Sequence, residues 1–274
     1  IYATANNGLK GAKISFPKVS VGATENLIIA ACKAKGRTIL SNCAIEPEVK
    51  DLSNFLIKLG CKIKWLGKRK VQIDGVKNLK DINYNIMFDR IEAVTYMIAA
   101  AATNGRVSIK NIQPKIIDKE ILLLKKIGVK IIEKKNKITI ISSKSLKGIN
   151  IKTSPYPGFP TDLQAQLMVL MCKAKNQSII RENIFENRFM HVSELNRMGA
   201  DIIVKGRKAI INGNKKLSGA QLMATDLRAS VSLVIAALIS NKKSIINRIY
   251  HLDRGYENIE KKLSNCGANI KRIK

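Results

Sequence analysis

Apolar positions along the chain follow two helical patterns separated by short strand-like runs. In the first pattern apolar residues cover almost the whole circumference of the helix, which predicts burial on all sides. This pattern occurs four times, at Leu27–Ala31, Met97–Ala101, Leu167–Met171 and Val231–Ile235. In the second pattern apolar residues occupy one face only, as expected for a helix that covers a sheet. Its clearest example consists of Val49, Leu52, Phe55, Leu56 and Leu59.

Glycine residues mark the ends of the one-faced helices. Each glycine precedes an apolar, strand-like run, which is typical of a left-handed cap at a helix C-terminus. The glycines are Gly60, Gly128, Gly199 and Gly267, so that successive ones lie 68, 71 and 68 residues apart. Each unit therefore reads helix, strand, helix, strand. A further strand is expected at Val71–Asp74, Lys137–Ile141 and Ala209–Asn212.

The length of the repeat bears on the fold class. Solenoid repeats usually run about 20–50 residues and need contacts only with their neighbours. A longer unit with an all-apolar helix favours an α/β fold in which the helices pack inside, the sheets lie outside, and the units close around a pseudo-symmetry axis. The last unit stops at Ile273 before any closing strand, so another segment, such as one upstream of Ile1, is a candidate to complete its sheet.

Composition narrows the class of protein. The 274 residues suffice for one large or two ordinary domains. The longest apolar stretch, near Ala229–Ser240, is too short to span a bilayer, and no export leader precedes it, so we expect a cytoplasmic protein without membrane insertion. A chain that opens on Ile1 without an initiator Met indicates a fragment.

The cysteines are scattered and form no C-x-x-C pair. This spacing suits neither a metal site nor a disulfide framework, so we expect small buried thiols and no metal. The five are Cys32, Cys43, Cys61, Cys172 and Cys266.

The formal net charge of +29 raises the possibility of a nucleic-acid partner, because clustered Lys and Arg neutralise phosphates. The lysines, however, are spread along the whole chain, and only one Trp is present. We therefore favour no nucleic acid, although a basic nucleic-acid-binding module remains an alternative.

The predicted starts of the buried helices are candidate anion sites, because free backbone N–H groups there bind anions. Arg90 and Arg228 fall in first turns, where the helix dipole disfavours a cation, and Arg188 and Arg254 occupy similar starts of the second helices. Either the arginines share a polyanion pocket, or each has a local ion pair. Acidic and polar neighbours fit capping boxes, namely Asp89 with Glu92 and Thr161 with Gln164.

Several long strings together resemble one family, the UDP-N-acetylglucosamine 1-carboxyvinyltransferases, which are enolpyruvyl transferases. The strings are Lys18–Thr24, Glu46–Glu48, Phe159–Gln166, Phe185–His191, Leu217–Gln221, Ala224–Ser230 and Arg248–Tyr256, and the similarity runs from about Leu9 to the C-terminus. The resemblance implies two domains, each built from three βαβαββ units around buried helices. Residues 1–81 would form the last unit of the first domain. Residues 82–274 would form the second domain, lacking a closing N-terminal strand.

The resemblance also implies an activity. Members transfer the enolpyruvyl group of phosphoenolpyruvate to the 3-hydroxyl of UDP-N-acetylglucosamine and release phosphate, which is the first committed step of peptidoglycan synthesis. No cofactor is expected. The general acid of the family, a Cys or Asp on a loop, would lie upstream of Ile1, so we expect no turnover from this chain alone. The shikimate-pathway enolpyruvyl transferase shares the fold but not these strings, and is the second candidate.

Site residues follow from the resemblance, position by position. Asp162 would accept a proton from the sugar hydroxyl, and Arg228 and Arg254 would bind the carboxylate and phosphate of phosphoenolpyruvate. Ile184 would contact the nucleotide sugar through its backbone. The UDP diphosphate would be held by Lys18, Val19, Ser20, Val21 and Gly22. Supporting or domain-closure roles would belong to Glu46, Arg90, Arg188 and Asp226.

Overall fold

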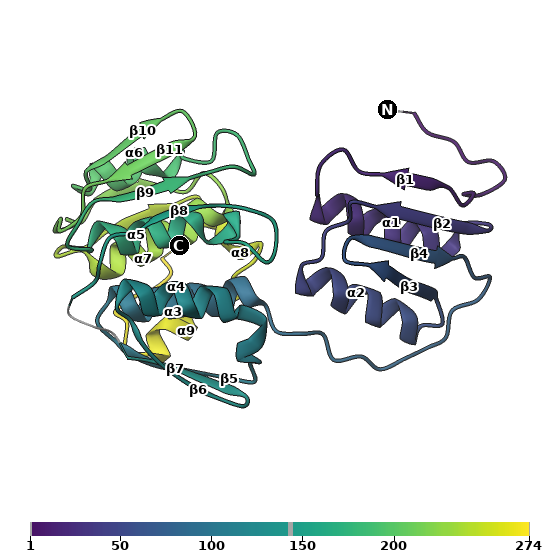
Figure 1. Cartoon of the computed structure of the whole chain (residues 1–274). Helices are drawn as coiled ribbons and strands as arrows, with labels where there is room; N and C mark the ends of the chain where they lie inside the picture. Colours follow the sequence, from purple (N-terminus) through teal and green to yellow (C-terminus); the bar gives the residue numbers. More distant parts are fainter. Residues whose placement is uncertain (1, 142–144, 274) are drawn as a thin grey trace. The chain divides into compact units, whose positions relative to one another are not determined.

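The computed structural model describes residues 2–141 and 145–273, which form two compact units (Figure 1). Unit 1 consists of residues 2–87 together with Pro155–Pro157. Unit 2 consists of Phe88–Ser154 and residues 158–273. Each unit has its own hydrophobic core.

Unit 1 is a single repeat with one mixed sheet. Its strands lie in the order β1-β2-β4-β3, with β1 parallel to β2 and the other pairs antiparallel. Helices α1 and α2 pack against each other and against the sheet. The elements are β1 (Lys13–Ser15), α1 (Val21–Lys33), β2 (Arg37–Ser41), α2 (Pro47–Lys58), β3 (Lys62–Gly67) and β4 (Lys70–Asp74).

Unit 2 contains three further repeats. The first has α3 (Arg90–Ala102), β5 (Arg106–Lys110), η1 (Pro114–Ile117), α4 (Asp118–Ile127), β6 (Lys130–Lys134) and β7 (Lys137–Ile141). The second has β8 (Asn150–Lys152), η2 (Thr161–Leu163), α5 (Gln164–Cys172), β9 (Ser178–Arg181), α6 (His191–Arg197), β10 (Ile202–Lys205) and β11 (Lys208–Ile211). The third has β12 (Gln221–Met223), α7 (Leu227–Ile239), β13 (Ile245–Asn247), α8 (Tyr250–Asp253) and α9 (Ile259–Asn265).

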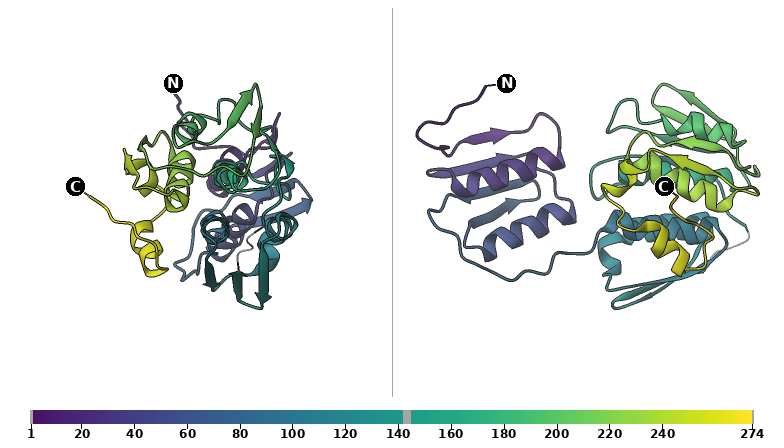
Figure 2. Two further views of the ribbon diagram at one scale, coloured as in Figure 1. Left: turned by 90° about the vertical axis from the view of Figure 1, so that its left-hand side faces the viewer. Right: turned by 180° about the vertical axis from the view of Figure 1, so that it is seen from behind.

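The first helices of these repeats, α3, α5 and α7, pack against one another in the middle of unit 2, with the sheets outside them (Figures 1 and 2). Every residue of α5 is buried, because apolar residues surround it on all sides. The sheets have the orders β5-β7-β6, β8-β9-β11-β10 and β12-β13. The predicted α/β class, with repeated βαβαββ units around buried helices, is confirmed.

One helix departs from the predicted burial. The segment Leu27–Ala31 lies on α1 and was expected to be buried on all sides. In the structure only one face of α1 is buried, and Ile29 is 49% exposed. Unit 1 contains one repeat, so α1 has no second interior helix against which to pack within its unit.

The predicted glycine caps are confirmed. The backbone φ angles of Gly60, Gly128, Gly199 and Gly267 lie between 91° and 111°, in the left-handed region that favours glycine. The prediction for the cysteines is partly wrong: four are buried, but Cys266 is exposed because it caps the end of the short surface helix α9. Within the described ranges, no helix has the length and apolar character needed to cross a membrane.

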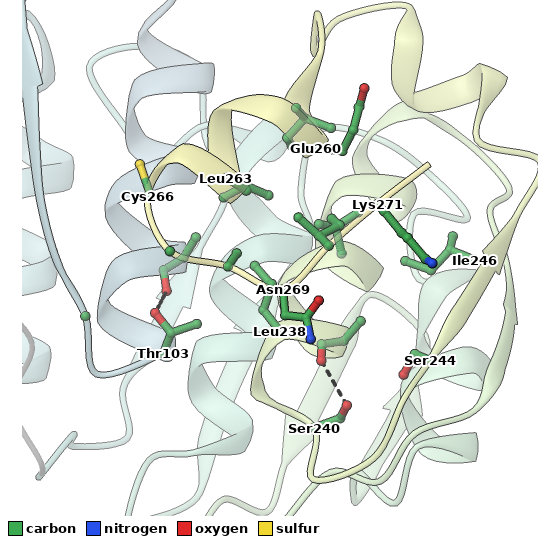
Figure 3. Close-up of a pocket in the computed structure, with 18 of the residues that line it drawn as sticks. Thr103, Leu238, Ser240, Ser244, Ile246, Glu260, Leu263, Cys266, Asn269 and Lys271 are labelled. Carbon is green, nitrogen blue, oxygen red and sulfur yellow. Dashed lines mark hydrogen bonds between the residues drawn. The ribbon is translucent and has the colours of Figure 1, made fainter. Parts of the chain in front are cut away.

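The third repeat of unit 2 leaves a large groove. In each of the other repeats, the strand between the two helices pairs with a further antiparallel hairpin. These hairpins are β4-β3 beside β2, β7-β6 beside β5, and β11-β10 beside β9. Among the described residues, β13 pairs only with β12, and a cavity of about 970 Å³ opens there. Leu238, Ile246 and Leu263 lie around it (Figure 3).

Candidate active site

Side chains at the N-terminal ends of α3, α5 and α7 meet in unit 2. Asp89 caps α3, since its Oδ1 accepts hydrogen bonds from the backbone N–H groups of Ile91 (2.8 Å) and Glu92 (3.0 Å). Asp226 caps α7 in the same way, accepting from Arg228 N (2.8 Å) and Ala229 N (3.0 Å). The supporting role predicted for Asp226 is therefore, in this structure, that of a helix cap.

The start of α5 is built differently. The predicted capping box of Thr161 with Gln164 is wrong, because the Thr161 hydroxyl donates instead to Glu182 Oε2 at 2.8 Å. Glu182 is 1% exposed, and its Oε1 also accepts from Thr153 Oγ1 and from the backbone N of Ile184. This buried carboxylate organises the loop after β9. Its role was not predicted from the sequence, where the only signal was a Glu at the end of an apolar strand.

Asp162 lies between two arginines. Arg188 Nη2 is 2.8 Å from Asp162 Oδ1, and Arg228 Nη2 is 3.0 Å from Asp162 Oδ2. Burial alone would raise the pKa of Asp162, but the charges and hydrogen bonds of Arg228 and Arg188 outweigh burial and hold that pKa below its ordinary value. The carboxylate is therefore ionised at neutral pH, and it still has 36% of its side-chain surface exposed.

A buried set of polar groups lies beneath this cluster. Gln166 Nε2 donates to the backbone carbonyl of Asp162 (2.9 Å) and to Thr95 Oγ1 (3.1 Å). The Thr95 and Tyr256 hydroxyl oxygens are 3.0 Å apart, and Arg228 Nη1 donates to Tyr256 Oη at 3.4 Å. These contacts connect α3, α5 and α7 to one another directly below Asp162.

Among the described residues, two of the predicted arginines make no ion pair with Asp162. Arg90 is buried, and its Nη1 is 3.6 Å from Glu120 Oε1, so it forms the local ion pair that the sequence left as an alternative. Arg254 is exposed at the end of α8. Within residues 2–141 and 145–273, its side chain makes no hydrogen bond or ion pair, so it is available to an incoming anion. Ile184 lies in the loop between β9 and α6 and is 37% exposed.

The residues predicted to hold a diphosphate form the start of α1 in unit 1. Ser20 is the N-cap, and its Oγ accepts from Ala23 N at 3.3 Å. Val19 and Val21 are partly exposed, and Lys18 and Gly22 are exposed; a side chain at Gly22 would meet open space. An exposed helix start next to a lysine is a suitable environment for an anion.

Glu46, also in unit 1, is 6% exposed and holds backbone groups of its own unit. Its carboxylate accepts from Ile45 N (2.9 Å) and from Tyr156 N (3.1 Å). Arg69 donates to the carbonyl of the same Tyr156 at 2.9 Å. Both backbone groups of Tyr156 are therefore fixed by charged side chains.

No cluster of potential metal ligands occurs among the described residues. One of the two histidines, His191, is packed in the interior, with 2% exposure. Burial lowers the pKa of His191 from 6.5 to about 4; Asp226 raises it and Arg188 lowers it by smaller amounts. His191 is therefore neutral at neutral pH.

We expect His191 to make stability depend on pH. Its pKa is lower in the folded state than in the unfolded state, so between pH 4 and 6.5 the unfolded chain binds the extra proton. The free energy of unfolding should therefore fall by about 3 kcal/mol as the pH drops through this window. In urea titrations, His191→Gln should flatten this part of the curve. An unchanged slope would show that His191 is solvated in the folded protein.

The chain resembles curated proteins over its whole length. It is 68% identical over 273 residues to UDP-N-acetylglucosamine 1-carboxyvinyltransferase of Pelagibacter ubique, covering 100% of this chain and 66% of that protein. The proteins of the same name from Geotalea daltonii and Rickettsia canadensis are 56% and 53% identical, covering 97% and 100% of this chain and 64% and 65% of theirs. These relatives confirm the sequence resemblance. The chain spans 64–66% of their length.

Solved structures confirm the fold. The enolpyruvyl transferase NikO from Streptomyces tendae has a TM-score of 0.89 at 24% identity, covering 98% of this chain and 68% of that one. An EPSP synthase from Acinetobacter baumannii has a TM-score of 0.73 at 19% identity, covering 97% and 64%. The EPSP synthase (3-phosphoshikimate 1-carboxyvinyltransferase) family matches residues 2–263, nearly all of the sequence, and the chain therefore belongs to that family.

Proposed function

We propose that the full-length protein transfers the enolpyruvyl group of phosphoenolpyruvate to the 3-hydroxyl of UDP-N-acetylglucosamine and releases phosphate. The observation that carries this proposal is the Asp162 carboxylate, held between Arg188 and Arg228 where the three buried helices begin. The curated relatives of that name, including one 68% identical, support the choice of acceptor. Such an enzyme would act in the cytoplasm, at an early step of cell-wall synthesis, and we propose no nucleic-acid partner.

In this proposal Asp162 orients the sugar hydroxyl and accepts its proton. A carboxylate with a lowered pKa is too weak a base to deprotonate an alcohol in the ground state. Proton transfer therefore accompanies formation of the new C–O bond, when the hydroxyl becomes acidic. The negative charge of an incoming anionic substrate would also offset the positive charges of Arg188 and Arg228, which would raise the pKa of Asp162 and make it a better base.

Arg228 and Arg254 supply positive charge for phosphoenolpyruvate. Arg228 is fixed by Asp162, whereas Arg254 is exposed and makes no described ion pair, so it can form a bidentate contact with a carboxylate or phosphate. The tetrahedral intermediate keeps the negative charges of the substrate. The Arg228 guanidinium, already oriented by Asp162, would stabilise those charges with little reorganisation.

The nucleotide would bind through backbone groups. The exposed start of α1, with Lys18 and the open space at Gly22, suits the diphosphate. The backbone at Ile184, held by Glu182, would contact the nucleotide sugar. Supporting roles are proposed for Glu46 within unit 1 and for Arg90, Arg188 and Asp226 within unit 2, through the ion pairs, caps and hydrogen bonds described above.

Calorimetric titration of the full-length protein tests this assignment. We expect saturable binding of UDP-N-acetylglucosamine, weakened by Lys18→Ala by about tenfold, which is the usual loss for one charged contact to phosphate. Lys68→Ala, an exposed lysine in the β3–β4 turn of the same unit, is the control and should bind like the wild type. Binding of shikimate 3-phosphate in place of the UDP-sugar would reject the proposal in favour of the second candidate.

We also propose that the groove beside β13 is filled in the full-length protein by a segment that adds strands to the last sheet. The support is internal, because each of the other three sheets has an antiparallel pair at this position. Residues 1–81 would then be the last repeat of a first domain, and residues 82–274 the bulk of a second.

The dye ANS, which binds exposed apolar surface, should fluoresce strongly with this chain and weakly with a chain of full family length. Equal fluorescence would contradict a filled groove.

A further inference from the structure

We propose that Tyr256 is a positioning residue that holds the Arg228 guanidinium in the orientation that reaches Asp162. This inference rests on the proposed function for its effect on turnover, but the geometry that carries it is independent of the substrate. The support is a buried series of hydrogen bonds through Ile91, Thr95, Tyr256 and Arg228, which begins inside α3 and ends at Asp162.

Thr95, in α3, is 2% exposed. Its hydroxyl has one proton and donates it to the backbone carbonyl of Ile91, one helical turn earlier, at 2.7 Å. The Thr95 oxygen is therefore an acceptor towards its other neighbours. It accepts from Gln166 Nε2 at 3.1 Å, and the Tyr256 hydroxyl at 3.0 Å must donate to it.

These hydrogen bonds fix the direction of the Tyr256 hydroxyl proton. Because its only proton points to Thr95, the Tyr256 oxygen is an acceptor towards its other neighbours. It accepts from Arg228 Nη1 at 3.4 Å and from Gln166 Nε2 at 3.4 Å. Burial raises the pKa of Tyr256 more than Arg228 lowers it, so the group remains a neutral phenol. A guanidinium is planar and rigid. Holding Nη1 therefore also sets the direction of Nη2, which lies 3.0 Å from Asp162.

Tyr256 is itself held rigidly. Its side chain is fully buried in a cluster with Val231, Leu252 and Ile259. The preceding Gly255 allows close packing, since a Cβ there would lie 2.9 Å from the Leu227 side chain at the start of α7. The tyrosine is therefore a fixed point against which Arg228 is oriented. It also fixes the chain two residues after Arg254, the second arginine proposed to bind phosphoenolpyruvate.

The test uses Tyr256→Phe in the full-length protein, which keeps the ring and removes only the hydroxyl. We expect kcat to fall about tenfold, as for loss of one hydrogen bond to a charged group, while KM for the UDP-sugar changes less than twofold. Thr95→Val should act in the same direction. The matched controls are Tyr96→Phe and Thr139→Val; the Thr139 hydroxyl is buried and bonds Ser108 on the outer sheet, away from the site. Both controls should keep wild-type kcat.

A readout independent of turnover separates this inference from the proposed function. The Arg228 Nε–H signal, assigned by NMR, should exchange with solvent at least about tenfold faster in Tyr256→Phe than in the wild type or Tyr96→Phe. Unchanged exchange would overturn the positioning role, whatever the activity. A wild-type protein without turnover, but with faster exchange in Tyr256→Phe, would retain the positioning role and reject the proposed function.

Discussion

Replacing Asp162 with Asn should lower turnover of the full-length protein by about 10³-fold, in the range expected for loss of a positioned proton acceptor. The amide keeps the size of the carboxylate but cannot take a proton from the sugar hydroxyl. Affinity for UDP-N-acetylglucosamine should fall no more than about threefold, because the base acts mainly in the transition state. Steady-state kinetics and calorimetric titration of the same preparation measure the two effects.

Asp201→Asn is the matched control for Asp162→Asn. Asp201 also belongs to unit 2 and pairs with a cation, Lys215, at 3.3 Å, but on the surface. Hydrogen bonds from Asn212 and Lys215 lower its pKa, so both substitutions remove an ionised, paired carboxylate. Asp201→Asn should retain turnover. Near-normal turnover in Asp162→Asn would remove Asp162 from the mechanism.

Replacing Gly75 with Ala should destabilise unit 1 by about 3 kcal/mol, the upper part of the range for overpacking. An added Cβ would lie 1.7 Å from the carbonyl oxygen of Ala34 and 2.8 Å from its carbon, so backbone must move. Gly213, just after β11 in unit 2, meets the carbonyl oxygen of Ala174 at 2.0 Å in the same manner. Chemical denaturation, followed by the fluorescence of Trp65 in β3, reports on unit 1.

Gly67→Ala is the matched control, because it should not lower the stability of unit 1. A Cβ at Gly67 would meet nothing within 4 Å, and its φ is not positive, so the substitution should be neutral or stabilise by a few tenths of a kcal/mol. Equal denaturation midpoints for Gly75→Ala and Gly67→Ala would contradict this prediction. They would show that the backbone at the end of β4 and at Ala34 moves apart to accommodate the added Cβ.

The features predicted correctly from the sequence are those that depend on local pattern. An all-apolar pattern favours a buried helix, and a glycine after a one-faced helix can take the left-handed conformation, so the repeats and their caps follow from residue order. Burial of α1 was overpredicted because the pattern does not say how many other helices share its unit. The close glycines Gly75 and Gly213 were missed, because the neighbouring backbone comes from about 40 residues earlier in each case.

The candidate site was predicted in part. Arg188 and Arg228 were selected from their positions at predicted helix starts, and Asp162 from a family resemblance; the structure brings the three together. Arg90 pairs instead with the buried Glu120, and Arg254 is exposed and makes no ion pair with Asp162 among the described residues. The chain from Thr95 to Tyr256 could not be predicted, since the two hydroxyls are 161 residues apart and contact only when three helices have packed.

The most direct test of the central claim is phosphate release by the full-length protein, given phosphoenolpyruvate and either UDP-N-acetylglucosamine or shikimate 3-phosphate. We expect release with the UDP-sugar, dependent on Asp162, and none above background with shikimate 3-phosphate. Release with shikimate 3-phosphate alone, or release with the UDP-sugar that survives Asp162→Asn, would contradict the account.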